Sequence, residues 1–146
     1  MAGRSERLKQ LRIKAGKSEK EMADVVGIPL VSYKPLESYD DEIMERLSLR
    51  QVKQLAQACG ISSRTLLLES ESHQNYIGCK TFTELAEKIK QHLSQHNLSI
   101  EKFAEETDWY LEDFINKPEL ALDRPAIFLV DLCKPVGLNW LDVVPI

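Results

Sequence analysis

The sequence has little of what marks several classes of protein. Its 146 residues include three cysteines, Cys59, Cys79 and Cys133, and this small odd number argues against a disulfide framework. No apolar run approaches the roughly 18 residues that cross a bilayer, and no apolar stretch follows the basic start as in a secretory signal. We therefore expect a globular cytoplasmic protein with reduced thiols and no membrane association.

Patterns that carry chemistry are also missing. The glycines form neither a phosphate-binding loop nor a dinucleotide fingerprint, and the carboxylates form no recognisable acid–base pair. His92 and His96 have the i, i+4 spacing that can share a metal ion, but no third ligand follows them. Cys59 and Cys133 lie at inward positions of predicted helices, which favours small core residues over nucleophiles. We predict no catalytic residues, no metal, no cofactor and no enzymatic activity.

Charge is unevenly distributed along the chain, whose formal net charge is −4. Residues 1–20 contain seven bases and two acids, giving +5, whereas residues 81–146 contain six bases and twelve acids, giving −6. A nucleic-acid-binding surface needs a basic face across its contact area. Only the N-terminal segment meets that requirement.

Apolar side chains at helical spacing predict five helices in the first half of the chain. Pro29 suits the start of the third helix, and Pro35 keeps that helix short. Ser18 and Glu21 stand at capping-box spacing. The other predicted ends are N-caps at Ser5 and at Ser62 or Ser63, and stops at Gly16, Gly27 and Gly60. Residues 69–80 lose the periodicity, and we predict that they are a linker.

The pattern then begins again. Thr81 and Glu84 form a second capping box, and Ser99 begins the next helix. Ala23 and Ala104 differ by 81 positions and Gly60 and Gly137 by 77, so the connection after the third helix is shorter in the second half. The sequence thus predicts an all-α fold with a domain over 1–68, a linker over 69–80 and a second, divergent domain over 81–146.

These segments resemble the lambda-repressor and Cro type of helix-turn-helix domain, present twice. The first copy contains LKQLRIKAGKSEKEMADVVGI, VSYKPLE and LRQVKQLAQACGISSRTLL; the second contains IKQHLSQHNLSIEKFAEETDW and IFLVDLCKPVGLNWLDVV. The resemblance implies two five-helix units, with Ala23 allowing close helix packing and Gly27 making the turn. It also implies an ion pair between Arg12 and Glu37. The second copy departs from the pattern at Asp108, which replaces the turn glycine.

The resemblance implies a transcriptional regulator that binds double-stranded DNA, with its third helix in the major groove. Either a homodimer or the two copies in one chain would address two half-sites. The candidate phosphate and base contacts are Arg4, Arg7, Lys14, Lys20, Ser32 and Lys34.

An alternative follows from the apolar outward face of the third helix, because large apolar patches usually mark partner surfaces. Pro35 and Glu19 also stand where the family commonly has polar or uncharged DNA-contacting residues. The chain would then be a protein-interaction module, similar to an antitoxin, antirepressor or immunity protein. Its candidate contacts are Leu30, Val31 and Tyr33 with the acidic loop Asp40, Asp41 and Glu42. A third interpretation is that the two copies pack together and bury these apolar residues.

Overall fold

The computed structural model describes residues 3–67 and 81–144, and in these ranges all regular structure is helical, which confirms the all-α prediction. The first half contains α1 (Arg4–Lys14), α2 (Glu19–Val26), α3 (Leu30–Tyr33), the 3₁₀ helix η1 (Lys34–Glu37), α4 (Glu42–Arg46), α5 (Leu49–Ala58) and α6 (Ser63–Leu67). The second contains α7 (Phe82–Gln95), α8 (Ile100–Thr107), α9 (Glu112–Asn116), η2 (Pro118–Asp123), α10 (Ala126–Cys133) and η3 (Trp140–Asp142). The predicted linker over 69–80, with Cys79, lies outside the described residues.

The predicted start of the first helix is wrong. Gly3, not Ser5, is the N-cap of α1, and Ser5 is buried in the first turn. The main-chain N–H and Oγ of Ser5 both donate to Asp40 Oδ1, at 3.2 and 2.5 Å. The carboxylate of Asp40, from a loop distant in sequence, thus accepts a hydrogen bond from the first turn of α1. Local spacing in the sequence cannot reveal such a contact. Gly3 lies directly against that carboxylate, so a larger side chain there would collide with Asp40.

The helix ends around the second and third helices agree with prediction. Ser18 and Glu21 form both hydrogen bonds of a capping box, each 3.1 Å long. Gly27 ends α2 in the left-handed conformation, and the α-helix after Pro29 stops at Tyr33, next to Pro35.

The region after Pro35 holds one helix more than predicted. The expected polar connection contains α4, whose Ile43 and Met44 are buried. α5 then begins with a capping box formed by Ser48 and Gln51. The first half therefore exceeds the five helices expected, because two apolar residues within an acidic stretch suffice for one buried turn.

Equivalent turns of the two halves have the same geometry. Gly27 has φ 71° and Asp108 has φ 62°, both left-handed. The next N–H donates back to the equivalent alanine in each case, Ile28 to Ala23 at 3.1 Å and Trp109 to Ala104 at 3.3 Å. Asp108 thus adopts the conformation that glycine supplies in the first half.

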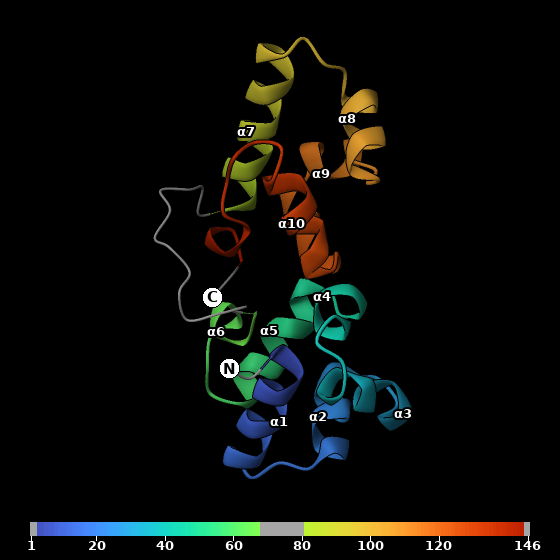
Figure 1. The fold of residues 1–146 in the computed structure, drawn as a ribbon, viewed down its shortest axis with the longest axis vertical. Helices are drawn as coiled ribbons and strands as arrows, with labels where there is room; N and C mark the ends of the chain where they lie inside the picture. The colour runs from blue at the N-terminus through green and yellow to red at the C-terminus, as the bar shows by residue number, and fades with distance from the viewer. Residues whose placement is uncertain (1–2, 68–80, 145–146) are drawn as a thin grey trace.

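The two halves are stacked along the long axis and meet through α4, α5 and α10 (Figure 1). At the junction the N–H of Leu49 donates to the carbonyl of Arg124 at 2.8 Å, and Ser48 pairs with Pro125 in an isolated antiparallel bridge. Ser48 and Pro125 precede equivalent helices and differ by the same 77 positions as Gly60 and Gly137. The halves therefore contact each other at corresponding points.

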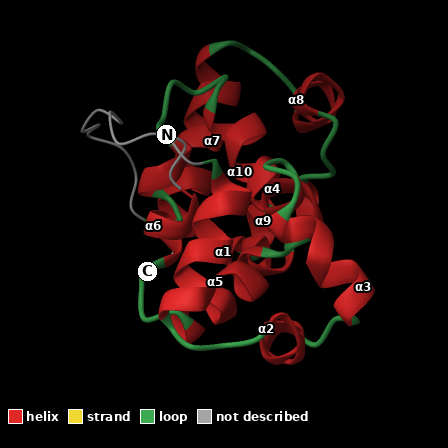
Figure 2. Cartoon of the chain, turned by 60° about the horizontal axis from the view of Figure 1, so that its bottom comes forward, coloured by secondary structure: helices red, strands yellow, loops and turns green. Residues whose placement is uncertain are grey.

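Buried apolar side chains from both halves form one continuous core. α2 and α3, and likewise α8 and α9, lie to the right of α1 and α7 in Figure 1, and Figure 2 also shows α3 and α8 on one side. Among the described helices, none is long and apolar enough to cross a membrane.

Candidate functional site

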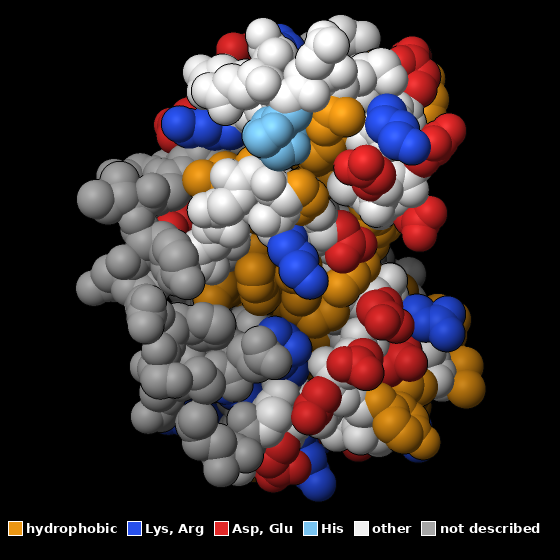
Figure 3. All heavy atoms as spheres, turned by 45° about the horizontal axis from the view of Figure 1, so that its top comes forward, with side chains coloured by type: hydrophobic (Ala, Val, Ile, Leu, Met, Phe, Trp, Pro, Cys, Tyr) orange, Lys and Arg blue, Asp and Glu red, His pale blue; other side chains and the backbone are white. Residues whose placement is uncertain are grey.

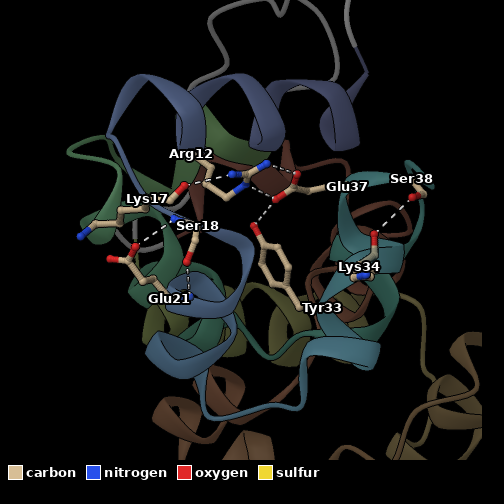
Figure 4. A network of polar contacts seen from close by, with 8 residues as sticks. All are labelled: Arg12, Lys17, Ser18, Glu21, Tyr33, Lys34, Glu37 and Ser38. Atoms are coloured by element: carbon tan, nitrogen blue, oxygen red, sulfur yellow. Dashed lines mark hydrogen bonds and ion pairs between the residues drawn. The ribbon is translucent and has the colours of Figure 1, made fainter.

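A buried polar network fixes the inner side of the third helix (Figure 4). Arg12 donates from Nε to Glu37 Oε2 at 2.7 Å and from Nη2 to Glu37 Oε1 at 3.0 Å. The Tyr33 hydroxyl donates to Glu37 Oε2 at 2.6 Å, and Arg12 Nη1 donates to the carbonyl of Lys17 at 2.9 Å. The Arg12 and Glu37 side chains are only 12% and 7% exposed. The ion pair that the resemblance implies is present, and it joins α1 to η1.

Tyr33 belongs to this network and not to the surface. The prediction that it faces outward toward a partner is wrong, because its ring is fully buried. Burial, and then the hydrogen bond to Glu37, raise the pKa of Tyr33 well above its usual value. The hydrogen bond to Glu37 raises the pKa of Arg12 as well. Tyr33 therefore remains a proton donor and Arg12 a cation throughout the physiological pH range.

With Tyr33 inside, the outward face of α3 consists of Val31, which is 77% exposed, and Ser32, with Leu30 half-buried. Beside it lies an open groove of about 520 Å³. The groove is bounded by α3, η1, α4 and the start of α5, and its lining residues are Ile28, Val31, Ser32, Pro35, Leu36, Tyr39, Glu42, Arg46, Leu47 and Gln51.

Tyr39 is a groove residue that the sequence interpretation missed. Its side chain is 64% exposed, so its ring is available to an occupant of the groove. The offsets of 81 and 77 differ by four, so the first half has four additional residues between its third helix and α5. Tyr39 lies in that stretch, and this length difference was the available signal.

The acidic loop has divided roles. Asp40 faces α1, where the hydrogen bonds from Ser5 lower the pKa of its carboxyl group. Asp41 is exposed just before α4. Glu42 lines the groove and forms an ion pair with Arg46, with 3.4 Å between Oε2 and Nε. Of the three predicted acidic contacts, Glu42 is the one in the groove.

Two of the six candidate DNA contacts are engaged elsewhere. Arg4 Nε donates to the carbonyl of Leu67 at 2.9 Å, and Arg7 Nη1 donates to that of Leu66 at 3.3 Å, so both hold the end of α6. The Arg4 guanidinium also lies 6.0 Å from the Trp140 ring centroid. These contacts give Arg4 and Arg7 a packing role, and their role as phosphate contacts stays a prediction.

The remaining candidates, Lys14, Lys20, Ser32 and Lys34, are exposed. Lys20 forms an exposed ion pair with Asp24 at 3.2 Å. These side chains come from four different helices, α1, α2, α3 and η1, and α3 itself contributes only Ser32.

The corresponding face of the second half is acidic. Leu111 is buried, whereas Tyr110 is 58% exposed and donates to Glu112 at 3.0 Å. Residues 100–119 contain seven acids and two bases, giving −5, and all seven acids are exposed. This half offers little to a phosphate backbone.

The histidines of the described part of the chain, together with Cys59, Cys133 and Trp109, make packing contacts. His92 and His96 have ring centroids 4.4 Å apart, and no group of three or more metal-ligating side chains occurs in the described part of the chain. Cys133 is buried in the core, as predicted, and Cys59 is half-buried, which raises the pKa of its thiol. Trp109 packs edge-on against Phe128 with centroids 5.0 Å apart and donates to Asp131. Trp109 therefore anchors the core of the second half.

Comparison with protein-family models, curated proteins and solved structures finds no match for this chain.

Proposed function

We propose that this chain is a non-enzymatic protein-interaction module built on two tandem helix-turn-helix-like units. The groove beside α3 is its binding site. The observation that carries the proposal is an open groove of mixed polar and apolar lining, along which Val31 and Tyr39 are exposed where a DNA reader needs polar side chains.

The dimensions of the third helix support this proposal. α3 has four residues, and the chain continues as a 3₁₀ helix that contains Pro35. A recognition helix in the major groove contacts base edges with several polar side chains. Within residues 30–37, the exposed polar side chains are Ser32 and Lys34, beside the exposed Val31. The segment suits an apolar contact better than base recognition.

Burial of the exposed side chains of the groove would supply binding free energy. Fully burying a side chain such as valine contributes about 1.5–3 kcal/mol, and aromatic residues such as tyrosine are frequent energetic anchors of interfaces. Val31 and Tyr39 are 77% and 64% exposed, so most of that gain is still available to a partner. The hydrogen bond from Tyr33 to Glu37 ties α3 to η1 and limits the backbone ordering that binding must supply.

The test compares immobilised full-length chains in capture of proteins from the source cells. Val31→Asp and Tyr39→Ser remove the two rim anchors, and Ile13→Asp is the matched control, because Ile13 is 58% exposed on α1 outside the groove. We expect a partner that the unaltered chain and Ile13→Asp both retain and that the two groove variants lose. Retention by all four chains, or no groove-dependent protein at all, contradicts the proposal.

Duplex DNA binding is the second candidate function, because Lys14, Lys20 and Lys34 are exposed. It requires duplex affinity that falls steeply with added salt and weakens in Lys14→Ala and Lys34→Ala chains. Equal, negligible binding at low and high salt excludes it.

A further inference from the structure

Acidic residues outnumber basic ones in the segment around the groove. Residues 31–46 contain the two bases Lys34 and Arg46, and their five acids are Glu37, Asp40, Asp41, Glu42 and Glu45. Two of the acids are used internally, because Glu37 binds Arg12 and Asp40 accepts hydrogen bonds from Ser5. Asp41 and Glu45 are exposed, and Glu42 remains in the groove itself.

Glu42 is the one carboxylate among the described residues that line the groove. Its side chain is 27% exposed, so it is partly withdrawn from water. Its partner Arg46 is 73% exposed and lies one turn further along α4, with a 3.4 Å separation. The ion pair is weak, because solvent around the exposed Arg46 screens it and both side chains lose rotamer freedom on pairing. Arg46 can therefore be displaced from Glu42 at little cost.

The apolar part of the groove lies beside this carboxylate. Ile28, Val31 and Pro35 line it from the α3 side, and Tyr39 lines it near the start of α4. In Figure 3, acidic and hydrophobic side chains lie next to each other at the lower right, the side on which Figure 1 shows α3. An occupant thus meets apolar surface next to the ion pair of Glu42 and Arg46.

We infer that the groove binds a protein segment with an apolar side chain next to an arginine or lysine, the apolar group contacting Val31 and Tyr39 and the cation replacing Arg46 at Glu42. This inference rests on the proposed function and names its partner class. Charge complementarity selects the occupant, because an acidic segment would face Glu42 in the groove and the exposed Asp41 that precedes it. Arginine suits the position best, because its planar fork can bind a carboxylate through two hydrogen bonds.

The test uses the full chain and two synthetic fluorescein-labelled peptides of about 16 residues, long enough for four helical turns. Both carry leucines at i, i+3, i+4 and i+7, and their remaining positions hold mostly arginine in one and glutamate in the other. Fluorescence anisotropy gives the dissociation constants. The variants are Glu42→Gln and Arg46→Gln, with Glu45→Gln as the matched control, because Glu45 lies on the same helix but does not line the groove. Circular dichroism verifies that each variant is folded.

The basic peptide is expected to bind about tenfold more tightly than the acidic one, a factor equivalent to about 1.4 kcal/mol. Glu42→Gln weakens its binding severalfold, Arg46→Gln strengthens it because the competing cation is gone, and Glu45→Gln changes it little. A groove that selects apolar side chains alone predicts no effect of either charge variant.

Different results would contradict the inferred basic partner and the proposed interaction function. If both peptides bind equally, and Val31→Asp abolishes the binding of both, the groove is an interaction site and the inferred basic partner is wrong. If neither peptide binds, or if Val31→Asp leaves the binding unchanged, the proposed function is contradicted together with the inference.

Discussion

Arg12 and Glu37 are joined by two hydrogen bonds, from Nε to Oε2 at 2.7 Å and from Nη2 to Oε1 at 3.0 Å. Tyr33 adds a third to the same carboxylate. This arrangement holds η1 against α1 from the inside, while Val31 and Tyr39 are exposed to solvent. The network thus ties local stability to the geometry of the groove.

Glu37→Gln is expected to lower the free energy of unfolding by about 3 kcal/mol, because it leaves the Arg12 guanidinium buried without its counter-charge. Tyr33→Phe loses about 1.5 kcal/mol, the contribution of a hydrogen bond to a charged acceptor. Urea unfolding followed by circular dichroism measures both. Lys20→Met is the control, since its exposed pair with Asp24 contributes at most about 0.5 kcal/mol. Equal effects of Lys20→Met and Glu37→Gln would contradict the structural role of the buried pair.

Asp108→Gly is expected to stabilise the protein by about 0.5–1 kcal/mol, because glycine adopts the left-handed conformation without the penalty of a Cβ atom. The converse substitution, Gly27→Ala, destabilises by about 1 kcal/mol. A Cβ atom at Gly27 would meet nothing within 4 Å, so this cost is conformational and not steric. Thermal unfolding of the two variants measures the pair of effects. A destabilised Asp108→Gly chain would show that the aspartate side chain itself supports the turn.

Asp40→Asn should show a pH-dependent loss of stability. The pKa of Asp40 is lowered in the folded chain, so its stabilising contribution is present above the unfolded pKa and is lost as pH falls through the folded pKa. We expect Asp40→Asn to cost about 1 kcal/mol at pH 6, as for loss of a helix cap, and the difference to shrink below about pH 4. Urea unfolding across this pH range measures it, with Asp41→Asn as control because Asp41 makes no side-chain cap bond. A difference that grows toward low pH would reverse the sign and refute the assignment.

The continuous core predicts that the two halves unfold together. Trp109 packs against Phe128 inside the second half, whereas Trp140 lies near Arg4 of the first, so in a Trp140→Phe chain the remaining fluorescence reports on the second half. Leu36→Ala removes a buried side chain from the first half and should cost about 3 kcal/mol. We expect the fluorescence and circular dichroism transitions to shift by the same amount. An unchanged fluorescence transition would mean that the halves unfold independently.

The sequence predicted those elements whose signals are local. The capping box at Ser18, the left-handed stop at Gly27 and the short helix before Pro35 each depend on a few neighbouring residues, and all are observed. The prediction that Ser5 is the N-cap was wrong, because Ser5 lies within the first turn and donates to Asp40, thirty-five positions away. Tyr33 was assigned to the surface because a one-turn helix has too few residues for periodicity to identify its inner face.

The candidate site was predicted in part for the same reason. Val31 and Glu42 belong to the groove as expected, but the groove itself is a tertiary feature formed when α4 packs beside η1. Tyr39 and Arg46 join it only through that packing. The contacts of Arg4 and Arg7 with the end of α6 were not predicted, because charge patterns do not show which cations bind backbone carbonyls within the fold.

The most direct test of the central claim is a two-dimensional NMR titration of the full chain, followed at the backbone amides, with the basic peptide in one series and duplex DNA in another. The account predicts saturable shifts at Val31, Tyr39 and Glu42 with the peptide, and no saturable shifts with the duplex. Saturable, salt-sensitive shifts at Lys14, Lys20, Ser32 and Lys34 with the duplex, and none in the groove with the peptide, would contradict it.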